Sequence, residues 1–313
     1  MKQATNRFRK FSSYLYNNYQ YYLLLLLPVV FYFIFKYLPM HGILIAFQDY
    51  NFMKGVWASP WVGLDVFNEV FKDKSFWNAF WNTLRLNGIA LVIGFPIPII
   101  FAMFLNEIRS NMYKKVIQSI SYLPHFISWV IIYGLILAFT TKETGLINTF
   151  LKAIGGTPIN FLTHKGWWLF LYVFSGIWKE MGWSAIIYFS ALSAINPELY
   201  EAASIDGAGR FRCMWHVTLP AIKNTIVIML LLAIGRIISI GFDQPYMLGN
   251  VMVADVSTVL STYIYEMGIL RAQFSYTAAV GLFQAGINFT LLIVADAFAK
   301  LLGEEGLFGR RTG

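Results

Sequence analysis

Six stretches of the chain are long and apolar enough to cross a lipid bilayer, and they constrain the fold more than any other feature. A membrane-spanning helix needs about 20 mostly apolar residues. Only 13% of the 313 residues are charged, whereas soluble domains carry about 25%. We therefore expect an all-α integral membrane protein. Its six expected spans cover residues 21–47, 76–105, 116–139, 167–192, 222–248 and 274–302.

The distribution of basic residues predicts the orientation of these spans. With the N-terminus in the cytoplasm, the cytoplasmic segments carry thirteen Lys and Arg and the outer segments seven. Basic residues favour the cytoplasmic side, so both termini are expected there. This divides the chain into an N-terminal segment (1–20), a six-helix membrane domain (21–302) and a C-terminal tail (303–313). The first apolar run is too long for a typical signal peptide, so we expect it to be retained.

Several kinds of chemistry are excluded by residues that the sequence lacks. Cys213 is the only cysteine, and the four histidines are widely scattered. A disulfide within the chain and a multi-cysteine metal site are therefore impossible. The phosphate-binding pattern GxxxxGK[ST] and the nucleophile pattern GxSxG are both missing. We expect no metal, no cofactor and no catalytic residue in this chain. Topology explains the net charge of +8 better than nucleic-acid binding does.

The loop at 193–221, between the fourth and fifth expected spans, is cytoplasmic by the charge count. Asn196 suits an N-cap and Pro197 the first helical position, so a short helix is predicted from Pro197 to about Asp206. Gly207 then ends or bends it. A second short helix is predicted over 210–216, and Pro220 predicts a turn before the fifth span. From the residues alone, the loop either docks in a partner's groove or lies on the membrane surface.

The segment EAASIDGAGRFRCMWHVTLP in this loop resembles the EAA motif of permease subunits of binding-protein-dependent ABC importers. Asn224 departs from the pattern, because many relatives carry a second proline there. WVGLDVF (61–67), YLPHFISWV (122–130) and YTAAVGLFQAGIN (276–288) also resemble carbohydrate-type permeases, and the resemblance covers nearly the whole chain. The motif positions are Glu201, Ala202, Ala203, Asp206, Gly207, Ala208, Leu219 and Pro220.

The resemblance implies a MetI-like permease fold in a bacterial inner (cytoplasmic) membrane. In that family the loop couples to the ATPase, so Glu201 and Asp206 would be polar docking contacts and Gly207 the required turn. The implied partners are a second homologous permease, two ATPase subunits, which hold ATP and Mg, and an extracytoplasmic solute-binding protein. The implied cargo is an oligosaccharide, with uronate-containing polysaccharide fragments as one candidate class. The chain itself would not be an enzyme.

Polar and aromatic residues inside the spans are candidates for the substrate path, because charges in a bilayer usually face a cavity or a partner. Arg236 would suit a uronate carboxylate; the alternative is an ion pair with Glu180 or Asp243. Lys179 and Glu180 either bind sugar beside tryptophans or pair between helices. Gln284 and Asn288 either line the path or bond another helix. The full set is Trp178, Lys179, Glu180, Trp183, Arg236, Asp243, Gln244, Gln284 and Asn288.

Two other function classes remain to be compared. An ion-coupled secondary transporter would use the charges within the spans, but such proteins usually show ten or twelve spans and inverted repeats. No such repeat is visible here. A membrane-embedded enzyme would need clustered catalytic side chains, which the sequence lacks.

Overall fold

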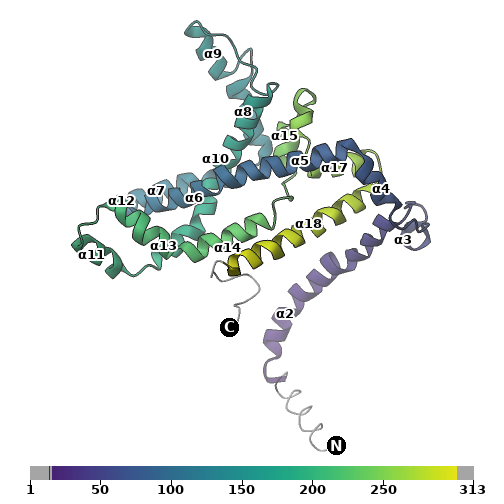
Figure 1. Ribbon diagram of the computed structural model, residues 1–313, viewed down its shortest axis with the longest axis horizontal. Coiled ribbons are helices and arrows are strands. Elements are labelled where there is room, and N and C mark those ends of the chain that lie inside the picture. The colour runs from purple at the N-terminus through teal and green to yellow at the C-terminus, as the bar shows by residue number, and fades with distance from the viewer. Residues whose placement is uncertain (1–13, 15, 302–313) are drawn as a thin grey trace, which may run out of the picture.

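The computed structural model describes residue 14 and residues 16–301, and its regular elements within that part of the chain are helices (Figure 1). Residues 1–13 and 15 of the expected N-terminal segment, and the whole tail expected at 303–313, lie outside the described residues. The body is built from five long helices: α5 (Lys74–Ile89), α6 (Pro96–Asn106), α10 (Lys165–Ser193), α14 (Lys223–Ile234) and α18 (Phe274–Leu301).

The body helices pack through small and aromatic side chains. α10 packs along α6, and α14 packs along α18. Gly182 of α10 lies so close to α7 (Asn111–Tyr122) that an added Cβ would sit 2.1 Å from the Ser121 carbonyl oxygen. Phe76 of α5 and Val280 of α18 are fully buried in one apolar cluster. In a bilayer such close packing is a main source of helix association.

Within the described residues, three helical stretches are long and apolar enough to cross a membrane, 19–47, 74–106 and 274–301, and two bent helix pairs would bring the number to five if each pair is one span. The three stretches correspond to the first, second and sixth expected spans. The first comprises α2 (Tyr19–Tyr32), η1 (Phe33–Tyr37) and η2 (Leu38–Phe47). The second joins α5 to α6 through a π-helical segment, η3 (Ala90–Gly94). α10 supplies the fourth expected span as one helix of 29 residues with Lys179 and Glu180 near its middle.

The third expected span, 116–139, is not a single helix. α7 and η4 (Leu123–Phe126) are separated from α8 (Trp129–Thr140) by a bend of 101°. Pro124 lies in η4, and Ile127 and Ser128 are extended. Proline restricts the backbone conformation of the residue before it and has no N–H to donate, so it tends to interrupt a helix. The hydropathy pattern predicted an apolar stretch of this length, but it did not predict the break within the stretch.

The fifth expected span, 222–248, is interrupted as well. α14 ends at Ile234, residues 235–242 are irregular, and α15 resumes only at Asp243–Leu248. Gly235 and Gly241 flank the irregular part, and glycine favours departure from the helix. Arg236 lies in this irregular part and Asp243 begins α15, so the two residues do not share a helix.

The loop at 193–221 folds largely as expected. α11 spans Pro197–Ile205, followed by α12 (Arg210–Cys213), a π-helical segment η5 (Met214–Thr218) and α13 (Leu219–Ala221). The turn predicted before the fifth span is confirmed as a 63° bend at Ile222, where α14 begins. The expectation that Pro220 excludes Leu219 from the helix is wrong, because Leu219 is helical. The wider π turn of η5 lies just before Pro220, and the chain remains helical at this proline.

A hydrogen-bonded cluster joins three elements at the end of the body opposite α11. Asp73 follows α4 (Asp65–Lys72) and caps α5 by accepting from the Ser75 N–H at 2.7 Å. Its other carboxylate oxygen accepts from Tyr263 of α17 (Leu260–Tyr265) at 2.6 Å and from Tyr276 of α18 at 3.0 Å. The cluster fixes α5 against α17 and α18.

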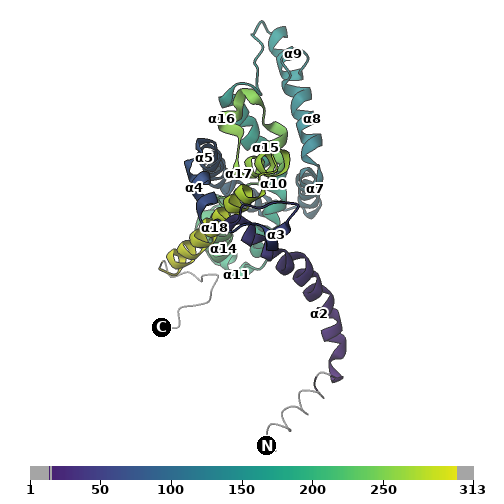
Figure 2. The same cartoon turned by 90° about the vertical axis from the view of Figure 1, so that its right-hand side faces the viewer.

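Two parts project from the body (Figures 1 and 2). α8 and α9 (Leu146–Ala153) form an arm, whose turn is held by the buried Asn148. α2 leaves the body on its own, and none of the most apolar part of its stretch is buried in this chain. The remaining short elements are α3 (Gly55–Ala58), η6 (Val251–Val253), α16 (Ala254–Ser257) and η7 (Glu266–Leu270).

Candidate functional site

The loop helix α11 stands at one end of the molecule (Figure 1). The Asn196 side chain accepts from the Glu198 N–H at 3.1 Å and so caps its start. At its end, Gly207 has φ +75° and Ala208 donates to the Ala203 carbonyl oxygen at 2.9 Å. Glycine adopts this left-handed conformation without the steric cost of a Cβ. The helix therefore has defined ends on both sides.

This loop exposes both charged and apolar side chains, and the rest of the described chain does not cover them. Glu201 and Asp206 are exposed and make no ion pair within the described residues. Ile205 is 87% exposed and Trp215 62%. Tyr200 ties the exposed helix to η5 through a 3.1 Å hydrogen bond to Thr218. This combination suits a docking surface.

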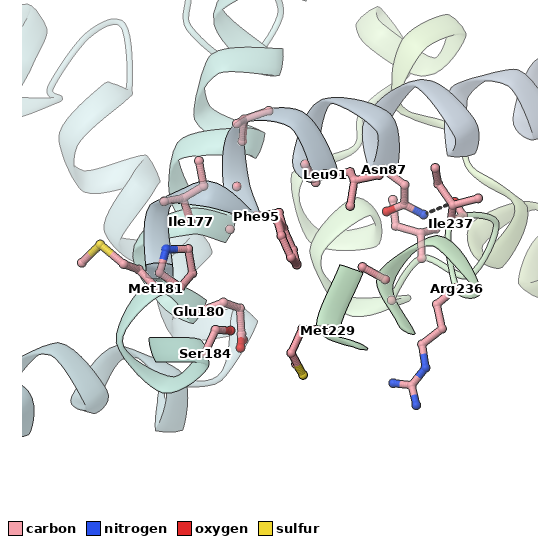
Figure 3. Close-up of a pocket in the computed structure, with 18 of the residues that line it drawn as sticks. Asn87, Leu91, Phe95, Ile177, Glu180, Met181, Ser184, Met229, Arg236 and Ile237 are labelled. Carbon is pink, nitrogen blue, oxygen red and sulfur yellow. Dashed lines mark hydrogen bonds between the residues drawn. The ribbon is translucent and has the colours of Figure 1, made fainter. Parts of the chain in front are cut away.

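A cavity of about 550 Å³ lies between α5, η3, α6, α10, α14 and the irregular segment 235–242 (Figure 3). Its wall is mostly apolar, with Phe95, Ile177 and Met229 among the lining side chains. Ligand cavities of this size and character commonly bind small molecules through a few polar groups. The polar lining residues are Asn87, Tyr172, Glu180, Ser184, Tyr188, Arg236, Ser239 and Gln244.

Arg236 lines this cavity from the irregular segment. Its side chain is exposed and belongs to no ion pair among the described residues. The expected alternatives, pairing with Glu180 or Asp243, are therefore not formed in this structure. Figure 3 places Arg236 and Glu180 on different sides of the cavity. An arginine without a carboxylate partner retains its hydrogen-bond donors for an anion.

Lys179 and Glu180 are adjacent in sequence, but their side chains contact different parts of the structure. The ammonium of Lys179 is buried and donates to the carbonyl oxygens of His125, at 2.5 Å, and Ile127, at 2.7 Å. These carbonyls belong to the break between η4 and α8, so Lys179 satisfies the backbone there. Glu180 lines the cavity, and its Oε2 lies 3.0 Å from Nδ1 of His125.

The two tryptophans expected on the substrate path, Trp178 and Trp183 of α10, lie outside the cavity lining. The Trp183 ring stacks on His125, with ring centroids 4.4 Å apart and planes 4° apart. Trp178 is 37% exposed. Asp243 is exposed and also lies outside the lining, whereas Gln244 lines it and donates to the Tyr172 carbonyl oxygen at 2.7 Å.

Gln284 and Asn288 of α18 bond another part of the chain, which was one of their two expected roles. Gln284 donates to the Ile238 carbonyl oxygen at 2.6 Å. Asn288 accepts from the Ile238 N–H at 3.3 Å and donates to the Ser239 hydroxyl at 2.7 Å. Asn87 of α5 donates to the Ile237 carbonyl oxygen at 2.7 Å (Figure 3). We call Asn87, Gln284 and Asn288 the amide clamp.

Five polar cavity residues were missed by the sequence analysis: Asn87, Tyr172, Ser184, Tyr188 and Ser239. Asn87 was detectable, because an amide in an apolar span carries the same signal as Gln284. Ser184 and Ser239 were not, because serine is common in spans and is often satisfied by its own helix. The break that brings Ser239 to the cavity became visible only in the structure.

Comparisons with known proteins agree with the fold. The family described as "Binding-protein-dependent transport system inner membrane component" matches residues 94–303. The polygalacturonan/rhamnogalacturonan transport system permease protein YteP of Bacillus subtilis is 46% identical over 92% of this chain and 89% of its own length. LplB of the same organism is 44% identical over 92% of this chain and 90% of its own length.

A solved structure extends the agreement to three dimensions. A chain from a bacterial ABC transporter involved in the import of the acidic polysaccharide alginate superposes with a TM-score of 0.86 and 36% identity. The match covers 94% of this chain and all of the other. The resemblance read from the EAA segment is thereby confirmed, as is the MetI-like permease fold. This chain belongs to the family of inner membrane components of binding-protein-dependent transport systems, the permease subunits of ABC importers.

Proposed function

We propose that this chain forms half of the translocation path of an ATP-driven importer for acidic, uronate-containing oligosaccharides. The observation that carries the proposal is Arg236, an arginine without a carboxylate partner on the wall of a cavity of about 550 Å³. Guanidinium binds carboxylate in a bidentate geometry. Relatives named for polygalacturonan and alginate transport support the same substrate class. Glu180, Ser184, Ser239 and Gln244 would meet the sugar hydroxyls.

The coupling loop, residues 193–221, is proposed to dock on the ATPase. Glu201 and Asp206 would supply polar contacts, and Gly207 the turn that ends the helix. Ala202, Ala203 and Ala208 would allow close approach, while Leu219 and Pro220 carry the connection toward α14. ATP and Mg would be held by the ATPase subunits, and this chain would supply path and linkage.

The membrane arrangement is proposed to comprise six spans within 21–302, with both termini in the cytoplasm of a bacterium. The broken stretches around Pro124 and around 235–242 would count as one span each. Helical breaks are tolerated at membrane depth where other side chains satisfy the backbone, as Lys179 and the amide clamp do here. Residues 1–20 and 303–313 would be cytoplasmic segments.

The assembly is proposed to contain a second homologous permease, two ATPase subunits and an extracytoplasmic solute-binding protein. One chain carries one coupling loop, whereas two ATPase subunits need two. The exposed α2 supports the pairing, because its most apolar stretch has no cover within this chain.

The test is a reconstituted complex of all these subunits in proteoliposomes. Binding protein loaded with oligogalacturonate should stimulate ATP hydrolysis and uptake, and Glu201→Ala should abolish both while the complex stays assembled. Arg236→Gln should lower uptake of oligogalacturonate by about 10- to 100-fold, the value of a hydrogen bond to a charged group. Its control is Arg85→Gln, an exposed arginine of α5 outside the cavity lining.

Two results would contradict the proposal. If Arg236→Gln lowers uptake of a carboxyl-reduced, neutral oligosaccharide as much as it lowers uptake of oligogalacturonate, Arg236 does not recognise the carboxylates of the substrate. If the isolated chain moves solute without any ATPase, the protein is an ion-coupled secondary transporter instead.

A further inference from the structure

The amide clamp holds a segment of backbone that leaves the α-helical pattern and keeps only turn hydrogen bonds, such as the one from the Ser239 N–H to the Arg236 carbonyl oxygen at 2.8 Å. This segment, residues 235–242, lies between α14 and α15. An unsatisfied backbone group in a bilayer costs several kcal/mol. The clamp side chains come from two other helices, α5 and α18, and meet the carbonyl oxygens of Ile237 and Ile238.

The clamp fixes one residue especially firmly. Ile238 donates its N–H to Asn288 and offers its carbonyl oxygen to Gln284, so both of its backbone groups are held by α18. Its side chain is 2% exposed, in the apolar cluster that includes Val280. Its neighbours Arg236 and Ser239 instead line the cavity. The segment is thus anchored on one side and presents polar groups on the other.

The helix before this segment is interrupted at both ends. α14 has 12 residues and begins at the 63° bend that follows the coupling loop. It ends at Ile234, and an added Cβ at the next residue, Gly235, would lie 2.7 Å from Leu292 of α18. Met229 of α14 lines the cavity directly, whereas Arg236 and Ser239 line it from the segment that follows the helix. A displacement of the coupling loop along α14 therefore reaches Arg236 and Ser239 through the clamped segment.

We propose that Asn87, Gln284 and Asn288 are positioning residues that couple α14 to the cavity wall, and thereby set how much solute is imported for each ATP hydrolysed. The inference rests on the proposed importer function. Without the clamp, the segment 235–242 is free to shift against α5 and α18. A movement of α14 is then absorbed in that segment and no longer displaces Arg236 and Ser239.

The experiment measures solute uptake and ATP hydrolysis together in the reconstituted complex with loaded binding protein. The variants are Asn87→Leu and Gln284→Met, which keep the size of the side chain and remove the donor to the backbone. We expect the ratio of solute imported to ATP hydrolysed to fall by about fivefold or more, while stimulated ATP hydrolysis persists. This corresponds to the lower cost of one unsatisfied buried hydrogen-bonding group.

Asn82→Leu is the matched control. Asn82 lies on the same helix as Asn87 and donates to the backbone carbonyl oxygens of Asp255, at 2.8 Å, and Thr258, at 3.0 Å. Those carbonyls lie outside 235–242. Asn82→Leu is expected to lower the melting temperature of the complex but to leave the import ratio unchanged.

The outcomes separate this inference from the proposed function. If the wild-type complex shows no ATP-driven uptake, the proposed function fails before the clamp is tested. If wild type is coupled and the clamp variants keep the wild-type ratio, or lose it only to the extent that Asn82→Leu does, the inference is wrong. If a clamp variant fails to assemble, Gln284→Asn is tested in its place, because it keeps an amide on a shorter side chain. An unchanged ratio in that variant, together with an unchanged ratio in Asn87→Leu, also overturns the inference.

Discussion

At the scale of single residues, close helix packing is concentrated at Gly182. An added methyl group would lie 2.1 Å from the Ser121 carbonyl oxygen, and backbone cannot move aside as a flexible side chain can. We expect Gly182→Ala to destabilise the solubilised protein by about 1–3 kcal/mol, the usual cost of overpacking. Gly88→Ala, a helical glycine with no heavy atom within 4 Å of its added Cβ, is the control. Equal melting temperatures of the two variants would contradict this account.

The Asp73 cluster predicts a dependence of stability on pH. Burial disfavours the ionised carboxylate, but hydrogen bonds from Tyr263, the Ser75 N–H and Tyr276 outweigh it and lower the pKa of Asp73 from 3.8. A group with a lowered pKa stabilises the fold above its unfolded pKa, and this stabilisation is lost as the pH falls through the folded value. Wild type should therefore melt higher than Asp73→Asn at neutral pH, and the difference should shrink below about pH 4.

The control for this prediction is Asp65→Asn, an exposed carboxylate at the start of α4. Its effect on the melting temperature should be small at every pH. A difference between wild type and Asp73→Asn that stays constant from pH 7 to pH 3 would show that the ionised carboxylate is not the stabilising species.

At the scale of elements, the end of α11 depends on a single glycine. Gly207 has φ +75° and open space around it, so Gly207→Ala introduces backbone strain and no clash. The left-handed conformation costs about 1–2 kcal/mol for a residue with a Cβ. We expect ATP hydrolysis stimulated by loaded binding protein to fall by up to about tenfold. Gly209→Ala is the control, because Gly209 has φ −71° and equally open space; a similar loss there would contradict the explanation.

Elements also mark the limit of what the sequence could predict. The ends of α11 followed from Asn196, Pro197 and Gly207, because capping depends on a few neighbouring residues. The breaks in the third and fifth expected spans did not follow, although Pro124 and Gly235 lie at them. Whether a glycine or proline breaks a helix in a membrane depends on side chains elsewhere that satisfy the freed backbone.

The same limit applies to the site. Arg236, Glu180 and Gln244 were expected on the substrate path from their charge or polarity within spans, and they line the cavity. Lys179 and Gln284 gave the same signal, but the structure shows them bonded to backbone carbonyls. Sequence shows that a buried polar group needs a partner, whereas only the fold shows which partner it has.

At the scale of the whole molecule, the uncovered α2 predicts a contact with another subunit. With Cys213→Ser removing the only native cysteine, a cysteine replaces Leu25, which is 57% exposed. We expect it to cross-link to the second permease in the assembled complex and to react with maleimide in the isolated chain. A cysteine replacing Val280, which is fully buried, should do neither. Failure of every exposed α2 position to cross-link would indicate that lipid covers this helix.

The π-helical segments have a consequence for how this chain is compared with its relatives. η3 and η5 each widen a helix by one residue per turn, and both lie in stretches that end in proline. Each helical residue turns the chain by about 100°, so loss of one residue from a regular α turn would rotate everything that follows to a new face. A residue can be inserted or deleted here without rotating the rest of the helix if the local turn changes between α and π. Single-residue gaps among homologues should therefore collect at 90–94 and 214–218, where they preserve the facing of every later side chain.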